Sequence, residues 1–255
     1  MIRGMKDKEA YSGIRIDEKP FCVIRCDGRN FHALTERVGF KKPYDRRLIE
    51  ALIESSITIF KEFPCVKVAF AFSDEVSFLL AKPYPFNGRV EKLDSIFASL
   101  LSSAFTCSLY SKLRVLEVVS FDARIVTLDN LDDILDYFAW RQMEAYRNFL
   151  NSYAYHAMRK RGLSPRRVAE ALKGLKAKEL IKVIKRSGVD IEKLPSWQSR
   201  GVLIFRRRYE KTGYDPMKRI QVKALRHRVD VCWDLPLFAK EGQDFLRRTI
   251  ENSMY

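Results

Sequence analysis

The sequence predicts an α+β fold in which helices cover an antiparallel sheet. Three observations predict it: short apolar runs bounded by turn residues, longer segments with apolar residues at helical spacing, and a regular order of the two along residues 1–161. The 255 residues are enough for one large domain or two small ones. An apolar fraction of 47% with 31% charged residues is typical of a soluble globular protein.

The first predicted strand covers residues 20–26, an apolar run that begins with a proline. Asp27 and Gly28 end this strand, and Gly28 permits a sharp turn and a close approach of a ligand to the backbone. A helix is expected to follow, up to Arg37. Asp27 therefore lies at a strand end next to free amide donors, a place suited to a phosphate or a metal-bound phosphate.

The next predicted helix covers residues 46–62, with Asp45 as its N-cap. Residues 66–72 and 76–81 then form two expected strands joined by the short turn Ser73-Asp74-Glu75. Acids flanked by strand core usually have a partner, commonly a metal ion, because burying a charge is costly. A solvated turn is the alternative, since Ser and Asp favour turns for local backbone reasons.

The elements that complete the first half are a helix over 89–113, a strand over 115–125 and a helix over 130–161. Without the helix over 46–62, the order is βαββαβ, the ferredoxin-like split unit. In that topology Asp27 and Asp74 lie on neighbouring strands. Two acids on adjacent strands are the arrangement that holds two magnesium ions in polymerases and nucleotide cyclases.

The character of the chain changes after Gly162. We expect a palm-like catalytic domain at 1–161 and a basic, mostly helical region at 162–255 that packs on it. The net charge is +15, of which residues 1–150 carry +1 and residues 151–255 carry +14. The expected elements here are short basic helices over 164–172 and 176–186, a strand over 201–208 that leads into a basic cluster, and a further basic segment over 218–228.

This charge asymmetry favours a polyanionic partner. Nucleic acid is preferred to an acidic membrane surface because no apolar face accompanies the basic runs, although each run can also be a solvated face. No apolar run approaches the roughly 20 residues of a membrane span, and the N-terminal residues lack a signal-peptide core, so we expect a cytoplasmic protein. The five cysteines lack the paired spacing of a zinc site and fit reduced thiols.

Two motifs carry a family resemblance: Arg25-Cys26-Asp27-Gly28-Arg29-Asn30-Phe31-His32 and Phe72-Ser73-Asp74-Glu75-Val76-Ser77-Phe78. Further matching stretches are Lys42-Pro43, Phe121-Asp122-Ala123-Arg124, Trp140-Arg141-Gln142 and Leu194-Pro195-x-Trp197-Gln198-x-Arg200-Gly201. With these residues the chain resembles, over most of its length, the tRNA-His guanylyltransferase family, including its guanylyltransferase-like 3′-to-5′ polymerases. The resemblance implies a polymerase-like palm that extends RNA at the 5′ end.

The resemblance also implies the roles of individual residues. Asp27, Asp74 and the Gly28 carbonyl would hold two Mg²⁺ ions, and Glu75 would be a third catalytic residue. The triphosphate site would be lined by Asp27, Gly28, Arg29, Asn30, Phe31, His32, Ser73 and Asp74, with Lys42 near the activating phosphates. The residues expected to bind tRNA, from the motifs and from the basic positions together, are Arg89, Lys92, Asn148, Arg200, Arg206, Arg207 and Arg208.

The implied reaction has two steps. A nucleoside triphosphate, ATP or GTP, activates the 5′-phosphate of a tRNA, and the 3′-hydroxyl of an incoming nucleotide, typically GTP, then attacks it. The eukaryotic members carry His-Ile-Asn-Asn where this chain has Tyr146-Arg147-Asn148-Phe149, which favours template-directed 5′-end addition or repair while leaving guanylate addition to tRNA-His open. The resemblance implies a homo-oligomer, a tetramer. The alternatives are a non-catalytic tRNA-binding protein and a nucleotide cyclase.

Overall fold

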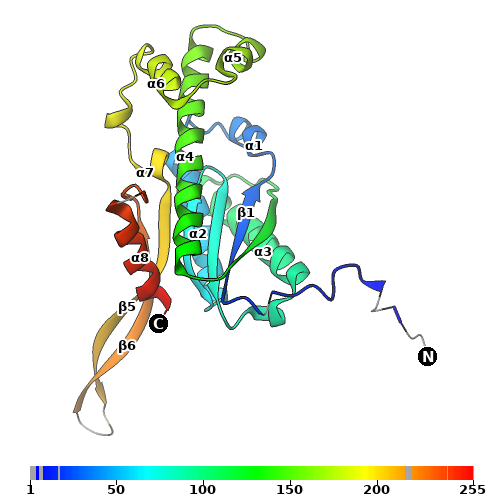
Figure 1. Cartoon of the computed structure of the whole chain (residues 1–255), viewed down its shortest axis with the longest axis vertical. Coiled ribbons are helices and arrows are strands. Elements are labelled where there is room, and N and C mark those ends of the chain that lie inside the picture. The colour runs from blue at the N-terminus through cyan, green and yellow to red at the C-terminus, as the bar shows by residue number, and fades with distance from the viewer. Residues whose placement is uncertain are drawn as a thin grey trace.

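Figure 1 shows the computed structural model, which describes residues 4–5, 8–16, 18–215, 217, 220–239 and 241–254. The elements of the first half are β1 (Phe21–Gly28), α1 (Phe31–Arg37), α2 (Arg46–Glu62), β2 (Val66–Phe72), β3 (Glu75–Ala81), the 3-10 turn η2 (Pro85–Gly88), α3 (Val90–Leu113), β4 (Phe121–Leu128) and α4 (Leu131–Lys160). Those of the second half are α5 (Pro165–Leu172), α6 (Ala177–Lys185), η3 (Ile191–Lys193), α7 (Trp197–Arg200), β5 (Val202–Asp215), β6 (Ile220–Cys232) and α8 (Glu241–Met254).

The described strands form one antiparallel sheet in the order β4-β1-β3-β2-β5-β6. The predicted α+β class and the βαββαβ order of the first half are therefore confirmed. Several strand boundaries in this half differ from the predicted ones, and the largest difference is at β4, which begins at Phe121 and not at residue 115. Residues 114–120 run without a strand partner, and the backbone N–H of Arg29 donates to the Ser120 carbonyl where the ladder begins.

Two hydrophobic cores lie on the two faces of the sheet. On one face, Ile24 of β1 and Phe78 of β3 pack against α2 and α3. On the other face, Val23 and Leu79 pack against α4 and α8. This alternation follows from the strand period of two, and it fixes which side chains of β1 point toward α4.

Among the described helices, α3 alone is long and apolar enough to cross a membrane by length and mean hydropathy. The sequence-based expectation that no segment approaches such a span is corrected on this point. In the structure one side of α3, with Leu93, Phe97, Leu101 and Phe105, is buried in the core under the sheet. Part of its apolar content is therefore core packing.

The C-terminal region is less helical than predicted. The helices α5 and α6 lie at the far end of α4, but β5 and β6 form a long hairpin that projects from the other end of the molecule (Figure 1). β5 joins the sheet through four residues, Val202–Phe205, which pair with Val68–Ala71 of β2. Arg207, Arg208 and the following basic residues obscure the strand pattern because this part of the hairpin is exposed on both faces. The predicted basic residues Lys218 and Arg219 lie outside the described residues.

Arg206 ties the hairpin to the palm. Its guanidinium donates to the carbonyls of Val66 (Nε, 2.8 Å), Phe63 (Nη2, 3.1 Å) and Phe60 (Nη2). These carbonyls lie at the end of α2 and the start of β2, where a helix leaves carbonyls without intrahelical partners. The tRNA-binding role of Arg206 stays a prediction, and in this structure its side chain is half-buried with Nε and Nη2 donating to carbonyls of the chain itself.

We predict that Arg206→Met lowers the free energy of unfolding by about 2 to 4 kcal/mol, because it removes the charged donor shared by three carbonyls while keeping the apolar stem. Urea denaturation measures the change, with Arg208→Met at an exposed position of the same strand as the matched control. Equal denaturation midpoints for the two variants would contradict the structural role of Arg206.

Candidate functional site

The end of β1 and the β2–β3 turn meet at one edge of the sheet. The Gly28 amide donates to the Asp74 carbonyl (3.0 Å), and Asp27 is the register partner of Glu75. Ser73 makes the turn tight by taking a left-handed conformation, with φ of 53°. The predicted meeting of Asp27 and Asp74, 47 positions apart, is thus what the strand pairing produces.

The carboxyl of Asp74 lies in a confined place. Its Oδ1 accepts a hydrogen bond from Ser73 Oγ (2.8 Å). Burial raises the pKa of Asp74, and the nearby charge of Asp27 raises it further. Within the described part of the chain, no Lys or Arg forms an ion pair with either acid. The Arg124 guanidinium hydrogen-bonds to Asp122, which raises the Arg124 pKa, and the charge of Asp27 raises it further. Two neighbouring carboxylates outside the ion pairs of the described residues fit a bound divalent cation.

Other metal ligands are few. No group of three or more His, Cys, Asp or Glu side chains that could hold a metal ion occurs among the described residues. Asp122 is the register partner of Asp27 on β4, but its carboxylate pairs with Arg124 (2.7 Å). Asp27, Asp74 and the Gly28 carbonyl are therefore the oxygen ligands that the site offers, and Mg²⁺ keeps most of its remaining ligands as waters and substrate phosphates.

Glu75 has a different environment from the other two acids. Its carboxylate is buried and receives two hydrogen bonds from Arg141 of α4, one of them from Nε at 2.8 Å. Ser77 Oγ also lies within hydrogen-bond distance of the carboxylate (3.3 Å) and of the Tyr137 hydroxyl (2.9 Å). This pairing satisfies Glu75 within the protein and joins α4 to β3, which gives Glu75 a structural role, and its catalytic role stays a prediction.

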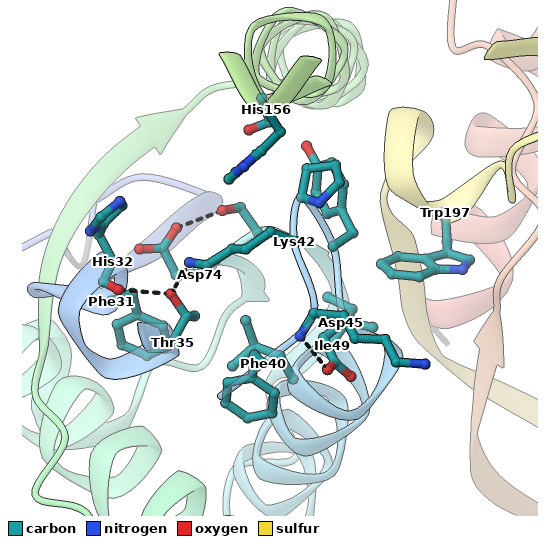
Figure 2. A pocket seen from close by; sticks show the side chains of 16 residues that line it. Phe31, His32, Thr35, Phe40, Lys42, Asp45, Ile49, Asp74, His156 and Trp197 are labelled. Atoms are coloured by element: carbon teal, nitrogen blue, oxygen red, sulfur yellow. Dashed lines mark hydrogen bonds between the residues drawn. The ribbon is translucent and has the colours of Figure 1, made fainter. Parts of the chain in front are cut away.

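A pocket of about 260 Å³ opens beside Asp74 (Figure 2). Ser73 and Asp74 form one wall, α1 contributes Phe31 and His32, and α4 contributes His156. The remaining lining residues are Thr35, Phe40, Lys41, Lys42, Pro43, Tyr44, Asp45, Leu48, Ile49, Ser152 and Trp197. The pocket thus joins a palm acid to basic groups and to an aromatic end.

Lys42 points into this pocket. Its Nζ donates to Thr35 Oγ1, and that hydroxyl donates to the His32 carbonyl (2.8 Å) (Figure 2). Asp45 does not neutralise Lys42, since it caps α2. Although burial opposes ionisation of Asp45, the Arg47 guanidinium and the backbone amides of Lys41 and Arg47 lower its pKa to about 2. The ammonium group of Lys42 is therefore available to an anionic ligand.

The predicted nucleotide-binding residues do not all line one hollow, and Asp27 and Gly28 line neither of the two described here. Phe31, His32, Lys42, Ser73 and Asp74 line the pocket. Arg29 and Asn30 instead line a second hollow of about 210 Å³ on the other side of α1. Gly28 is constrained by packing, because a Cβ there would lie 2.4 Å from the Phe31 ring.

The predicted tRNA-binding residues do not gather on one surface. Arg89 and Lys92 lie where α3 begins, at the end of the sheet that carries Phe21, whereas the acids lie at the Gly28 end. Asn148 is exposed on α4, and Arg207 and Arg208 are exposed on the hairpin. Arg200 Nη1 donates to the Leu235 carbonyl (2.9 Å). This hydrogen bond joins α7 to the segment that precedes α8.

Most of the lining residues were not predicted as site residues, among them Thr35, Tyr44, His156 and Trp197. Ser152 and His156 are four residues apart on α4 and so share one helix face, but that spacing is as typical of packing as of binding. Trp197 packs edge-on against Tyr44 (6.1 Å between ring centroids), which agrees with the core role favoured for an aromatic residue.

An antiparallel sheet with two acids on adjacent strand ends, next to a pocket that carries a lysine and two histidines, defines a palm-type fold suited to handling phosphates. The comparisons with known proteins agree. A family model described as Thg1, tRNAHis guanylyltransferase, matches residues 3–129.

Relatives extend the match along the chain. The tRNA(His) guanylyltransferase of Debaryomyces hansenii is 29% identical over 220 residues, covering 82% of both chains. The probable tRNA(His) guanylyltransferase of Dictyostelium discoideum is 28% identical over 231 residues, covering 88% of this chain and 90% of its own.

Solved structures match the fold. A bacterial Thg1-like protein in complex with ATP has a TM-score of 0.73 and 25% identity, with 96% of each chain covered. The tRNA(His) guanylyltransferase of Saccharomyces cerevisiae has a TM-score of 0.69 and 26% identity, with 80% of this chain and 93% of that chain covered. This chain belongs to the tRNA-His guanylyltransferase family, as the resemblance predicted.

We predict that Glu75→Ala destabilises the protein by about 3 to 5 kcal/mol, because it leaves the buried Arg141 charge without a partner. The double variant Glu75→Ala with Arg141→Ala should cost less than the two single changes together. Urea denaturation of the set measures this coupling. Additive losses would show that the pair does not fasten α4 to β3.

Proposed function

We propose that this chain is a Mg²⁺-dependent nucleotidyltransferase that adds nucleotides, GMP especially, to the 5′ end of tRNA in the 3′-to-5′ direction. The observation that carries the proposal is the placement of Asp27 and Asp74 on adjacent strand ends beside the Lys42 pocket, where neither acid forms an ion pair with another described residue. Family membership supports the reaction class. Bacterial Thg1-like proteins of the same fold are known in complex with ATP and with GTP, which supports these nucleotides as ligands.

The residues have separate tasks in this proposal. Asp27, Asp74 and the Gly28 carbonyl would hold two Mg²⁺ ions, which would supply charge neutralisation for the phosphates when bound. Lys42 and His32 attract the phosphates of a nucleotide in the pocket, and Ser73 orients the Asp74 carboxylate. Phosphoryl transfer asks mostly for charge neutralisation and in-line positioning, so no nucleophilic side chain is needed.

The proposed substrate range depends on a short segment in which this chain differs from the eukaryotic members of the family. Asn148 is the one residue of the family's eukaryotic His-Ile-Asn-Asn segment that this chain keeps, and its side chain is exposed on α4. We therefore propose template-directed addition or repair of tRNA 5′ ends as the main activity, with guanylate addition to tRNA-His as a second one. A homotetramer in the cytoplasm is part of the same proposal, as the resemblance implies.

We predict that Asp74→Asn reduces incorporation of labelled GMP into 5′-truncated tRNA by about 100-fold or more, since losing one metal ligand removes roughly 3 kcal/mol of transition-state stabilisation. The affinity for tRNA should stay the same, because Asp74 lies in the pocket wall and not on the basic surface. Asp136→Asn, an exposed acid on α4, is the control. Unchanged incorporation by Asp74→Asn would refute the two-metal proposal.

We predict that replacing both Arg207 and Arg208 by Glu weakens tRNA binding and reduces the slope of log K against log salt by roughly one for each lost phosphate contact. The matched pair is Arg89→Glu with Lys92→Glu, at the other end of the sheet. Fluorescence anisotropy at several salt concentrations measures both slopes. A slope that changes only in the second pair would place the RNA at the start of α3 instead of on the hairpin.

A further inference from the structure

His156 is a pocket residue to which neither the sequence motifs nor the proposed reaction assigns a task. It lies near the end of α4, half-buried, and its imidazole points into the pocket from the side opposite α1 (Figure 2). Its ring packs edge-on against Tyr155 (5.3 Å between centroids). Within the described part of the chain, the His156 side chain has neither a hydrogen bond nor an ion pair.

The groups that face His156 are mostly cationic. Burial lowers the pKa of His156, and Lys42, His32, Lys160 and Arg159 lower it further. Lys42 approaches the same space from the loop before α2, while His32 lies across the pocket on α1 (Figure 2). A half-buried imidazole without a partner, held near an ammonium group, lacks an acceptor that an anion would supply.

The position of His156 in the pocket favours contact with the phosphates of a nucleotide over contact with its base. Trp197 and Tyr44 form the aromatic end of the pocket, and Trp197 lies on the far side of the loop that carries Lys42, away from His156 (Figure 2). Trp197 is buried in the hydrophobic core and Tyr44 packs against it, so this end of the pocket offers apolar contacts. His156 shares the end with Lys42, where phosphate oxygens would gather.

We propose that His156 donates a ring N–H to the phosphate chain of a nucleoside triphosphate in this pocket, opposite Lys42. The inference rests on the proposed function, since it assumes that the pocket holds a nucleotide. It adds a binding residue on α4 to those on the palm, so that the phosphates bridge the sheet side of the pocket and the long helix. A neutral imidazole suffices for this task, because one ring nitrogen carries a hydrogen in either tautomer.

The test compares the affinities of the full chain for ATP, inorganic tripolyphosphate and adenosine, measured by isothermal titration calorimetry in a buffer that contains Mg²⁺. The variants are His156→Leu, which removes the donor, and His156→Gln, which keeps an N–H. The control is His227→Leu, at an exposed position of the hairpin. Urea denaturation midpoints of each variant separate a binding effect from loss of fold.

We expect His156→Leu to lower the affinities for ATP and for tripolyphosphate by the same factor of about ten, since one hydrogen bond to a charged group is lost. Adenosine binding should not change, and His156→Gln should recover most of the affinity for ATP and tripolyphosphate.

Unchanged affinities in His156→Leu would overturn the inference while leaving the proposed function intact. Weaker ATP binding with unchanged tripolyphosphate binding would also overturn it, because His156 would then contact the nucleoside. Failure of the unmodified chain to bind either ATP or tripolyphosphate would overturn the inference and the proposed function together.

Discussion

The register between β1 and β3 is the constraint on which the site depends. Asp27 pairs with Glu75, and the next residue, Gly28, bonds to the Asp74 carbonyl. A slip of one residue would turn Asp27 to the opposite face of the sheet, toward α2 and α3. The buried residues of β1 prevent such a slip, because Ile24 and Val23 belong to different cores on the two faces. The hydrophobic pattern thus positions a carboxylate that contributes nothing to the core itself.

Asp74 and Glu75 are adjacent in the sequence but lie in opposite electrostatic environments. Glu75 is buried and paired with Arg141, whereas Asp74 lies close to Asp27 and forms no ion pair with the other described residues. A protein that only needed a stable turn would gain nothing from the second arrangement, because crowding two carboxylates costs free energy. The unpaired acids therefore identify the part of the sheet edge where an external cation is expected, and the paired acid identifies the part that holds the helix.

The first half of the fold was predictable because its strands alternate and its helices have regular spacing and caps. Asp27, Asp74, Lys42 and His32 were also predictable, since each lies in a local motif. The partner of Glu75 was not, because Arg141 is 66 positions away and nothing local links them. The internal hydrogen bonds of Arg206 were unpredictable for the same reason, because its Val66 carbonyl acceptor is 140 positions away in the sequence. No sequence motif pointed to His156, because it lies in a long helix whose regular apolar spacing is explained by packing.

The hairpin has a consequence for how the protein can change over evolutionary time. From Arg206 outward, β5 pairs only with β6, and from Arg207 to Tyr214 its side chains are exposed. The outer part of the ribbon therefore contributes little to the cooperative unit that contains the acids, and insertions or substitutions there cost little global stability. Selection can reshape this arm for a new partner while the chemistry at the sheet edge stays fixed. The exposed hairpin can therefore diversify in sequence, whereas the register between β1 and β3 cannot change without moving the acids.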